Sequence, residues 1–286
     1  MFTCKVENNR NNILTLTQIE SVYQIIGISG LNPPNAQINT SLTSGLDGSQ
    51  FNSSSLNERN IVLTIKINGD VEKNRINLYK FFRIKEWCKF YYKNSTRDVY
   101  IEGYVESVDV DLFTNNEIMQ ISIICPNPYF KNAEEIIDDI SKVLSAFEFP
   151  FAINTSQPIP FSNIDISKIT NVYNNSESET GVIIEIDVLG IVNTIQIRDT
   201  QTGKTFTLNY NFIENDKIII DTNKGNKSVK LIRNAQTINL FTSMKKGSTF
   251  FQLDIGDNLF SYLADNGLSD EFVFVRFKHY TLYGGV

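Results

Sequence analysis

The chain has 286 residues, of which 41% are hydrophobic and 20% are charged, and its formal net charge is −6. This size and composition are typical of a soluble globular protein with room for about two domains and without long disordered stretches. The acidic balance argues against nucleic-acid binding, which usually requires a basic excess or a basic stripe, so no sequence-specific nucleic-acid partner is expected.

Cysteine and histidine are too sparse for a metal site or a disulfide framework. Cys4, Cys88 and Cys125 are widely spaced, no Cys-x-x-Cys occurs, and His279 is the only histidine. We expect the thiols to act as small hydrophobes, and we predict no metal and no cofactor. No apolar run reaches the ~18 residues of a membrane span, and no signal-peptide pattern opens the chain. The protein is therefore predicted to be made in the cytosol, to stay soluble and to have no membrane partner.

A long polar segment interrupts the first strands. Residues 13–17 and 23–28 are rich in β-formers, and a Gly-Leu-Asn-Pro-Pro break follows them. Residues 36–55 are polar, with Asp47-Gly48 as a hairpin-turn signal. Such a hairpin in a compact domain is usually functional or interfacial, and a merely mobile loop is the alternative. The candidate oligomer-interface residues are Ile38, Thr40, Leu42, Leu46, Asp47 and Phe51.

The remainder of the first domain is predicted to be mostly antiparallel sheet. A strand over 60–67 leads to a helix over 71–87, a hairpin formed by 89–93 and 98–112, and an Ile-rich strand over 117–125. That strand stops because two prolines remove ladder donors. The predicted hinge motif there is Cys125, Pro126, Pro128 and Tyr129. Residues 1–131 are thus predicted to form an α+β domain.

The next segment has helical spacing, and the chain beyond it has the spacing of short strands. Over 133–144 an apolar stripe indicates a helix, so residues 132–149 are predicted to be a helical linker. From residue 150 to 286, short alternating segments separated by turns predict a β-sandwich, whose last strand is allowed to return towards the first domain.

No arrangement of reactive residues indicates catalysis. Asp109 and Asp111 share one strand face without a third ligand nearby in sequence. His279 is the only candidate base, and no Gly-x-Ser-x-Gly nucleophile motif occurs. Trp87 with the neighbouring Tyr91 and Tyr92 is typical of core packing rather than of a sugar-stacking platform. We predict no catalytic residues and no enzyme activity.

Several stretches resemble a known family. They are Gly30–Pro34, Gly45–Ser49, Glu58–Leu63, Asn74–Tyr79, Ile101–Glu106 and Cys125–Phe130, and the closing Tyr283-Gly284-Gly285-Val286 fits in pattern. Together they are similar to the distal tail proteins of tailed phages of Gram-positive hosts. The resemblance is close over residues 15–131 and extends to the second domain in pattern only.

The resemblance implies a fold and a place of action. It implies a split-barrel-like first domain with a helix and a long hairpin, and a galectin-like sandwich as the second domain. It also implies a hexameric ring in the tail tip or baseplate of a phage or a phage-tail-like bacteriocin, with the first domain forming a belt. The implied partners are other copies of the chain, the tail tube protein, the tail hub protein and a receptor-binding or fibre protein. Such rings are adaptors and not enzymes.

Two other functions stay open at this point. The main alternative is a glycan-binding sandwich that attaches the particle to the host cell wall, and a weaker one is an accessory domain of an enzyme. An aromatic, concave sheet face on the second domain would favour glycan binding, and a polar face would favour docking.

Overall fold

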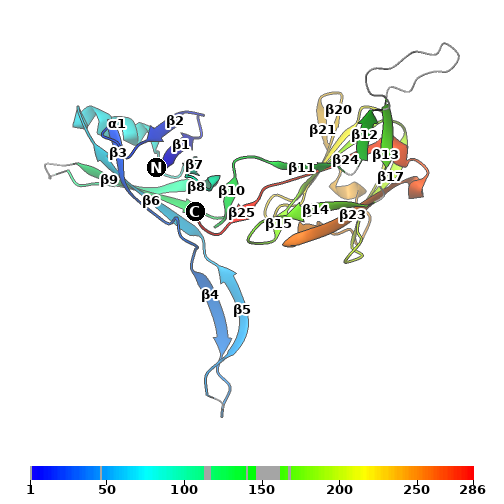
Figure 1. Ribbon diagram of the computed structural model, residues 1–286, viewed down its shortest axis with the longest axis horizontal. Coiled ribbons are helices and arrows are strands. Elements are labelled where there is room, and N and C mark those ends of the chain that lie inside the picture. The colour runs from blue at the N-terminus through cyan, green and yellow to red at the C-terminus, as the bar shows by residue number, and fades with distance from the viewer. Residues whose placement is uncertain (1, 46, 113–116, 140, 146–161, 167–168) are drawn as a thin grey trace. The chain divides into compact units, whose positions relative to one another are not determined.

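A computed structural model describes residues 2–45, 47–112, 117–139, 141–145, 162–166 and 169–286 (Figure 1). The chain divides into two compact units. Unit 1 comprises Met1–Ala133 and Leu282–Val286, and unit 2 comprises Glu134–Thr281. The chain therefore passes from unit 1 to unit 2 and returns to unit 1 with its last five described residues.

Unit 1 is built on one antiparallel sheet with the strand order β2-β1-β7-β8-β9-β6-β3. Its two end strands approach each other, because the Ile25 N–H donates to Thr17 O at 2.9 Å and Thr17 forms a parallel bridge to Gln24. This closure gives the predicted split-barrel form. The strands are β1 Thr3–Asn8, β2 Ile13–Leu16, β3 Tyr23–Ser29, β6 Arg59–Ile67, β7 Trp87–Lys93, β8 Asp98–Val110 and β9 Ile118–Cys125.

The core of unit 1 follows from strand alternation. Every second residue of β6 is buried, starting at Arg59 and continuing through Ile61 to Ile67. The helix α1 spans Val71–Phe81, with Asp70 as its N-cap. It is shorter than the predicted 71–87, because Lys85 has a positive φ of 69° and the backbones of Lys85 and Glu86 bond to Val105 of β8.

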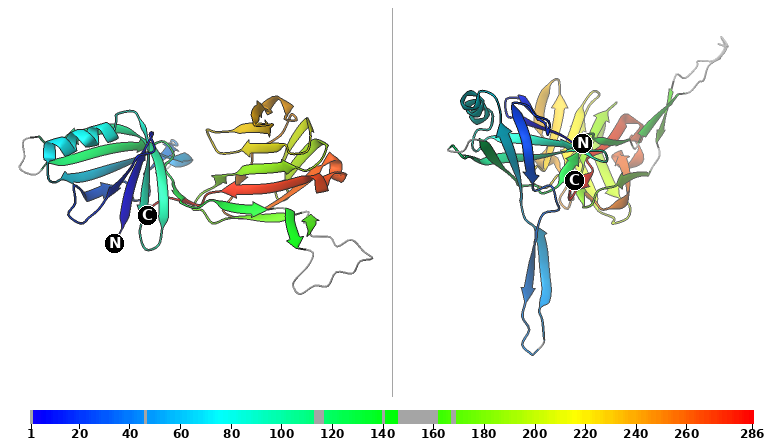
Figure 2. Two further views of the ribbon diagram at one scale, coloured as in Figure 1. Left: turned by 90° about the horizontal axis from the view of Figure 1, so that it is seen from above. Right: turned by 60° about the vertical axis from the view of Figure 1, so that its left-hand side comes forward.

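The predicted hairpin is present as β4 Ala36–Ser41 and β5 Gln50–Leu56, which pair only with each other among the described strands. Figure 2 (right) shows it extending away from the sheet of unit 1. Two short strands complete unit 1. β10 Phe130–Asn132 pairs with β8 and with β25 Leu282–Tyr283 at the end of the chain.

Unit 2 is a β-sandwich, as predicted. One sheet has the order β11-β24-β16-β19-β20-β21 and the other β14-β23-β17-β18, and their facing side chains form one hydrophobic core. The first sheet consists of β11 Ile136–Asp139, β24 Val273–His279, β16 Ile183–Val188, β19 Lys217–Asp221, β20 Ser228–Arg233 and β21 Gln236–Asn239. The second consists of β14 Thr170–Asn174, β23 Gly256–Ala264, β17 Val192–Asp199 and β18 Thr205–Phe212.

Short elements complete unit 2. Two strand pairs lie outside the two main sheets: β12 Ser141–Ser145 with β13 Ser162–Ile166, and β15 Thr180–Gly181 with β22 Gln252–Leu253. Three 3₁₀ turns follow later strands: η1 Phe241–Ser243, η2 Asp265–Gly267 and η3 Asp270–Phe272. With one α-helix among the described residues, the mainly β fold class with some helix is confirmed.

The helix predicted over 133–144 is wrong. These residues form β11 and β12 instead, apart from residue 140, which lies outside the described part of the chain, as do residues 146–161 of the predicted linker and sandwich start. In β11, Ile136 pairs with His279 and Asp139 pairs with Arg276. The first part of the apolar run therefore forms an end strand of the sheet, because pairing with β24 overrides a weak helical preference.

Candidate functional site: an exposed hairpin and a buried arginine

Every residue of β4 and β5 is exposed to solvent. Ile38 is 56% exposed, Phe51 61% and Leu42, just beyond β4, 87%. An isolated two-stranded hairpin is marginally stable in water, and monomeric proteins rarely expose several large apolar side chains together. These features make the hairpin a candidate contact surface.

The hairpin has one apolar and one polar face, and a bulge produces this separation. Ile38 pairs with Ser54 and Thr40 pairs with Phe51, so Asn52 has no partner. Without this extra residue, alternation would place Phe51 on the opposite face from Leu56. The apolar face carries Ala36, Ile38, Thr40, Phe51, Ser54 and Leu56, and the polar face carries Gln37, Asn39, Ser41, Gln50, Ser53 and Ser55.

The polar face is connected by side-chain hydrogen bonds, while the side chains of the apolar face are exposed to solvent. Asn39 Nδ2 donates to Ser53 Oγ at 3.0 Å, and Ser41 Oγ donates to Asn52 Oδ1 at 3.3 Å. Of the candidate interface residues, the structure brings Ile38, Thr40 and Phe51 together on the apolar face. Asp47 lies exposed near the tip, and Leu46 lies outside the described residues.

The candidate hinge motif lies inside unit 1. Cys125 ends β9 as a buried residue, and the Tyr129 N–H donates to Asn127 Oδ1 at 3.1 Å to form the turn that leads into β10. The carbonyl oxygen of Pro128 in this turn accepts a hydrogen bond at 2.7 Å from Nε of Arg59. The motif thus holds Arg59 as well as ending the sheet.

Arg59 is a buried cation that bonds to main-chain carbonyls. Besides Pro128, its guanidinium donates to Asn32 O at 2.6 Å and to the carbonyl oxygens of Gly30 and Gly284. Its guanidinium carbon lies 4.6 Å from the centre of the Phe130 ring. Burial lowers the pKa of Arg59, and Cys125 opposes that shift. No carboxylate lies within ion-pair distance of it in the described part of the chain, so carbonyl dipoles and the ring compensate the charge.

The end of the chain completes this arrangement. Arg97 donates to the carbonyl oxygen of Gly285 and stacks 4.2 Å from the centre of the Tyr283 ring, and the Val286 N–H donates to Leu31 O at 3.1 Å. A Cβ at Gly285 would lie 2.9 Å from Pro33 Cδ, so only glycine fits this approach. The final segment is therefore an integral part of unit 1.

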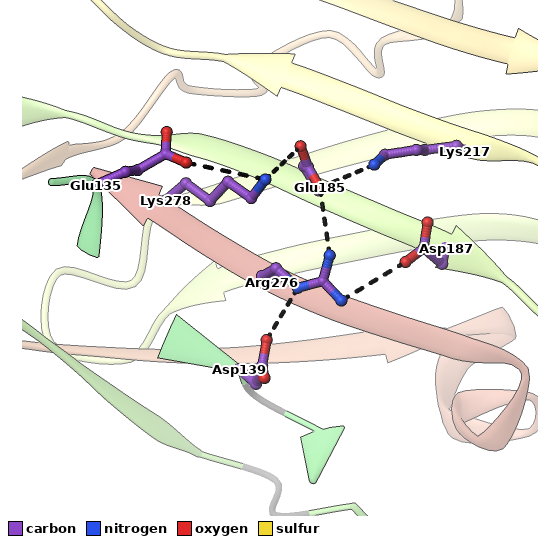
Figure 3. Close-up of polar contacts among 7 residues, drawn as sticks. All are labelled: Glu135, Asp139, Glu185, Asp187, Lys217, Arg276 and Lys278. Carbon is purple, nitrogen blue, oxygen red and sulfur yellow. Dashed lines mark hydrogen bonds and ion pairs between the residues drawn. The ribbon is translucent and has the colours of Figure 1, made fainter. Parts of the chain in front are cut away.

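An ionic network covers the outer face of one sheet of unit 2 (Figure 3). Glu185 is paired with Lys278 at 2.9 Å, with Lys217 at 3.0 Å and with Arg276 at 3.4 Å. Arg276 also bonds to Asp139 at 3.1 Å, and Lys278 lies 3.9 Å from Glu135. Burial opposes ionisation of Glu185, but hydrogen bonds from Lys278 and Lys217 outweigh it and lower its pKa.

This network has two consequences for unit 2. It fastens β11, which follows directly from unit 1, to β24. It also makes this face of the sheet largely polar, with Phe274 lying 5.1 Å from the Arg276 guanidinium carbon.

Arg59 and the network were not predicted from the sequence, although a signal for Arg59 was present. Arg59 lies two residues before Ile61 and four before Leu63, so strand alternation already places it on the buried face of β6. The network depends on strands far apart in sequence, and nothing local indicates it. The three thiols are buried as expected, and burial raises the pKa of each to about 12.

The described residues offer little support for a metal site, a catalytic histidine or a membrane-spanning helix. No group of three or more metal-binding side chains gathers in the described residues. His279 is buried, with Nε2 at 3.5 Å from Asp138 Oδ2. No helix in the described part of the chain is long and apolar enough to cross a membrane.

Known proteins share both a family pattern and the fold of this chain. Residues 175–279 match the family model SPP1_Dit, described as "Siphovirus-type tail component, C-terminal domain". The predicted resemblance to phage distal tail proteins is thus confirmed, with a family match over residues 175–279.

Solved structures share the fold over almost the whole chain. The Dit protein (gp 19.1) of phage SPP1, titled a paradigm of the hub adsorption apparatus in Gram-positive-infecting phages, matches with a TM-score of 0.68 at 12% identity, covering 97% of this chain and 98% of that one. Chains of the activated phage p2 baseplate with Ca and with Sr match with TM-scores of 0.56 and 0.51 at 12% and 11% identity. These cover 98% and 97% of this chain and 98% of each of theirs. A comparison with curated proteins found no match.

Proposed function

We propose that this protein forms a six-membered ring in the tail tip or baseplate of a phage or phage-tail-like particle. In this ring, unit 1 acts as the belt and unit 2 is the peripheral sandwich domain. The ring joins the tail tube protein to the tail hub protein and to a receptor-binding or fibre protein. It acts as an adaptor and not as an enzyme.

The observation that carries this proposal is the fully exposed, amphipathic hairpin on unit 1. In a monomer its apolar face costs free energy, and contact with another copy removes that face from water. In a closed ring the contact is head to tail, so the hairpin of one copy meets a different surface of the next copy and does not have to be complementary to itself. The fold shared with SPP1 Dit and with chains of the p2 baseplate supports the same conclusion.

The acidic chain is also consistent with a belt around a DNA channel. The formal net charge of −6 would repel the phosphate backbone, so DNA would slide without adhering. The polar outer face of unit 2, occupied by the network around Glu185, suits docking of a further tail protein.

The test is the mass of the protein in solution, measured by light scattering behind size exclusion over a concentration series. We expect a hexamer, or a monomer that becomes a hexamer on concentration. Substituting Ile38 and Phe51 together by serine should move this transition to higher concentration, because both side chains lie on the apolar face. The matched control is Ser53→Ala and Ser55→Ala on the polar face, which should leave it unchanged.

Circular dichroism must show unchanged folding in both variants. A hairpin variant that assembles as well as the control would contradict the role of the hairpin.

A further inference from the structure

Three exposed apolar residues lie in or just before an end strand of the sheet of unit 1. Ile19 is 63% exposed, Val22 48% and Ile26 48%. They belong to the turn before β3 and to β3 itself, the end strand of the sheet. Ile25 pairs with Ile65 and Gly27 with Thr64, so Ile26 is the extra residue of a bulge. We call Ile19, Val22 and Ile26 the edge patch.

The edge patch and the hairpin share an unusual lack of charge. Residues 12–29 contain one charged side chain, Glu20, and residues 36–56 contain one, Asp47. At the chain average of 20% charged residues, each segment would hold about four, and depletion of charge is the mark of interface cores. The helix α1 also exposes apolar Ile76 and Tyr79, but Lys73 and Lys80 lie beside them. The edge patch, whose own segment carries a single charged side chain, is therefore a better contact surface for the nearly uncharged hairpin than the exposed face of α1.

We infer that the apolar face of the hairpin of one copy packs on the edge patch of the next copy around the ring. This inference rests on the proposed ring and names its receiving surface. Each copy presents a hairpin and an edge patch, so the contact is heterologous and repeats around a closed ring. Within its own copy the hairpin is exposed along its whole length, so it is free to reach a neighbour.

The contact is made by side chains and not by extension of the sheet. The receiving strand β3 is interrupted by a bulge at Ile26, and the Ile25 N–H beside it already donates to Thr17 O. A bulge disturbs the row of free backbone groups that strand addition requires and so protects an edge from unspecific pairing. The apolar side chains on either side remain available for packing.

Charge reversal and rescue test this inference. Ile19→Lys with Ile26→Lys, and separately Ile38→Glu with Phe51→Glu, should each raise the concentration at half-assembly on the order of tenfold or more, because charges are then buried in an apolar contact. An equimolar mixture of the two variants, or one chain carrying all four substitutions, should recover much of the loss. The matched control is Ile84→Lys with Ile137→Lys, at residues that are 49% and 52% exposed outside both surfaces.

The outcomes separate the inference from the proposed ring. If the hairpin variant fails to assemble while the edge-patch variant assembles like the control, the ring stands and the inference is overturned. A second measurement covers a chain that stays monomeric: Phe51→Cys and Ile26→Cys proteins are mixed at high concentration under mild oxidation. A mixed disulfide joins only different copies and supports the inference. Its absence, together with a monomeric wild type, would count against both the inference and the ring.

Discussion

Replacement of Arg59 by lysine should release the end of the chain from unit 1. Arg59 donates to four main-chain carbonyl oxygens, at Gly30, Asn32, Pro128 and Gly284. Lysine keeps the positive charge but has one nitrogen with three donors, so it cannot reproduce the planar fork. We expect at least two of the four contacts to be lost.

The magnitude follows from the contacts. A hydrogen bond to a charged group contributes about 1.5–3 kcal/mol, so two lost bonds cost about 3 kcal/mol before relaxation. Only the bond to Gly284 O lies in residues 282–286, so opening of this segment loses one bond of about 1.5–3 kcal/mol, and its amide hydrogens should exchange roughly ten- to hundredfold faster, since about 1.4 kcal/mol corresponds to a factor of ten. The Val286 N–H, which donates to Leu31 O at 3.1 Å, is the most direct reporter.

Hydrogen exchange read by mass spectrometry on the carboxyl-terminal peptide is the assay. Arg83→Lys is the control, because the Arg83 side chain is 53% exposed and its ion pair with Glu86 is 3.7 Å long. The reasoning is refuted if the peptide exchanges at the same rate in Arg59→Lys, Arg83→Lys and the unaltered protein. Unaltered exchange would mean that strand pairing of β25 with β10 alone holds the segment.

Three further changes have defined outcomes. Gly103→Ala should lower the free energy of unfolding by about 1–3 kcal/mol through overpacking, because its Cβ would lie 2.7 Å from Ile124 O and 2.8 Å from Cys125 Sγ; denaturation with urea measures this, and an unchanged midpoint would contradict the packing. Glu185→Gln should weaken unit 2 near neutral pH and reduce its loss of stability in acid. The lowered pKa of Glu185 makes its contribution present above the unfolded pKa of about 4.3 and lost as the pH falls below it; parallel acid profiles for both proteins would refute this. The three buried thiols, each with a pKa raised to about 12, should resist iodoacetamide at pH 8 until the protein unfolds, and rapid labelling of the native protein would show that they are accessible.

Most of the strands could be predicted from the sequence, because the alternation of apolar and polar residues is a local property. The Ile-rich strand over 117–125 is β9, and its abrupt end at the prolines is where the structure turns into β10. The hairpin was also recognisable, from a polar run with Asp47-Gly48 at its centre. The bulge at Asn52, which puts Phe51 on the apolar face, has no local signal of this kind.

Elements that depend on distant partners were the ones missed. The run from Ile136 to Leu144 fits a helix by its own spacing, and only its pairing with β24 makes the first part a strand. The same holds for Arg59, whose carbonyl partners come from three separate parts of the chain, the last of them more than 200 positions away at Gly284. Local pattern could place this side chain on the buried face but could not identify its acceptors.

The return of residues 282–286 to unit 1 has a consequence for biosynthesis. Unit 2 is encoded between the two parts of unit 1, so the ribosome makes all of unit 2 before unit 1 can receive its last strand, β25. A chain whose synthesis stops early lacks the carbonyl groups that Arg59 and Arg97 bind. Completion of unit 1 therefore has to wait for translation of unit 2, and until then β10 lacks its partner β25.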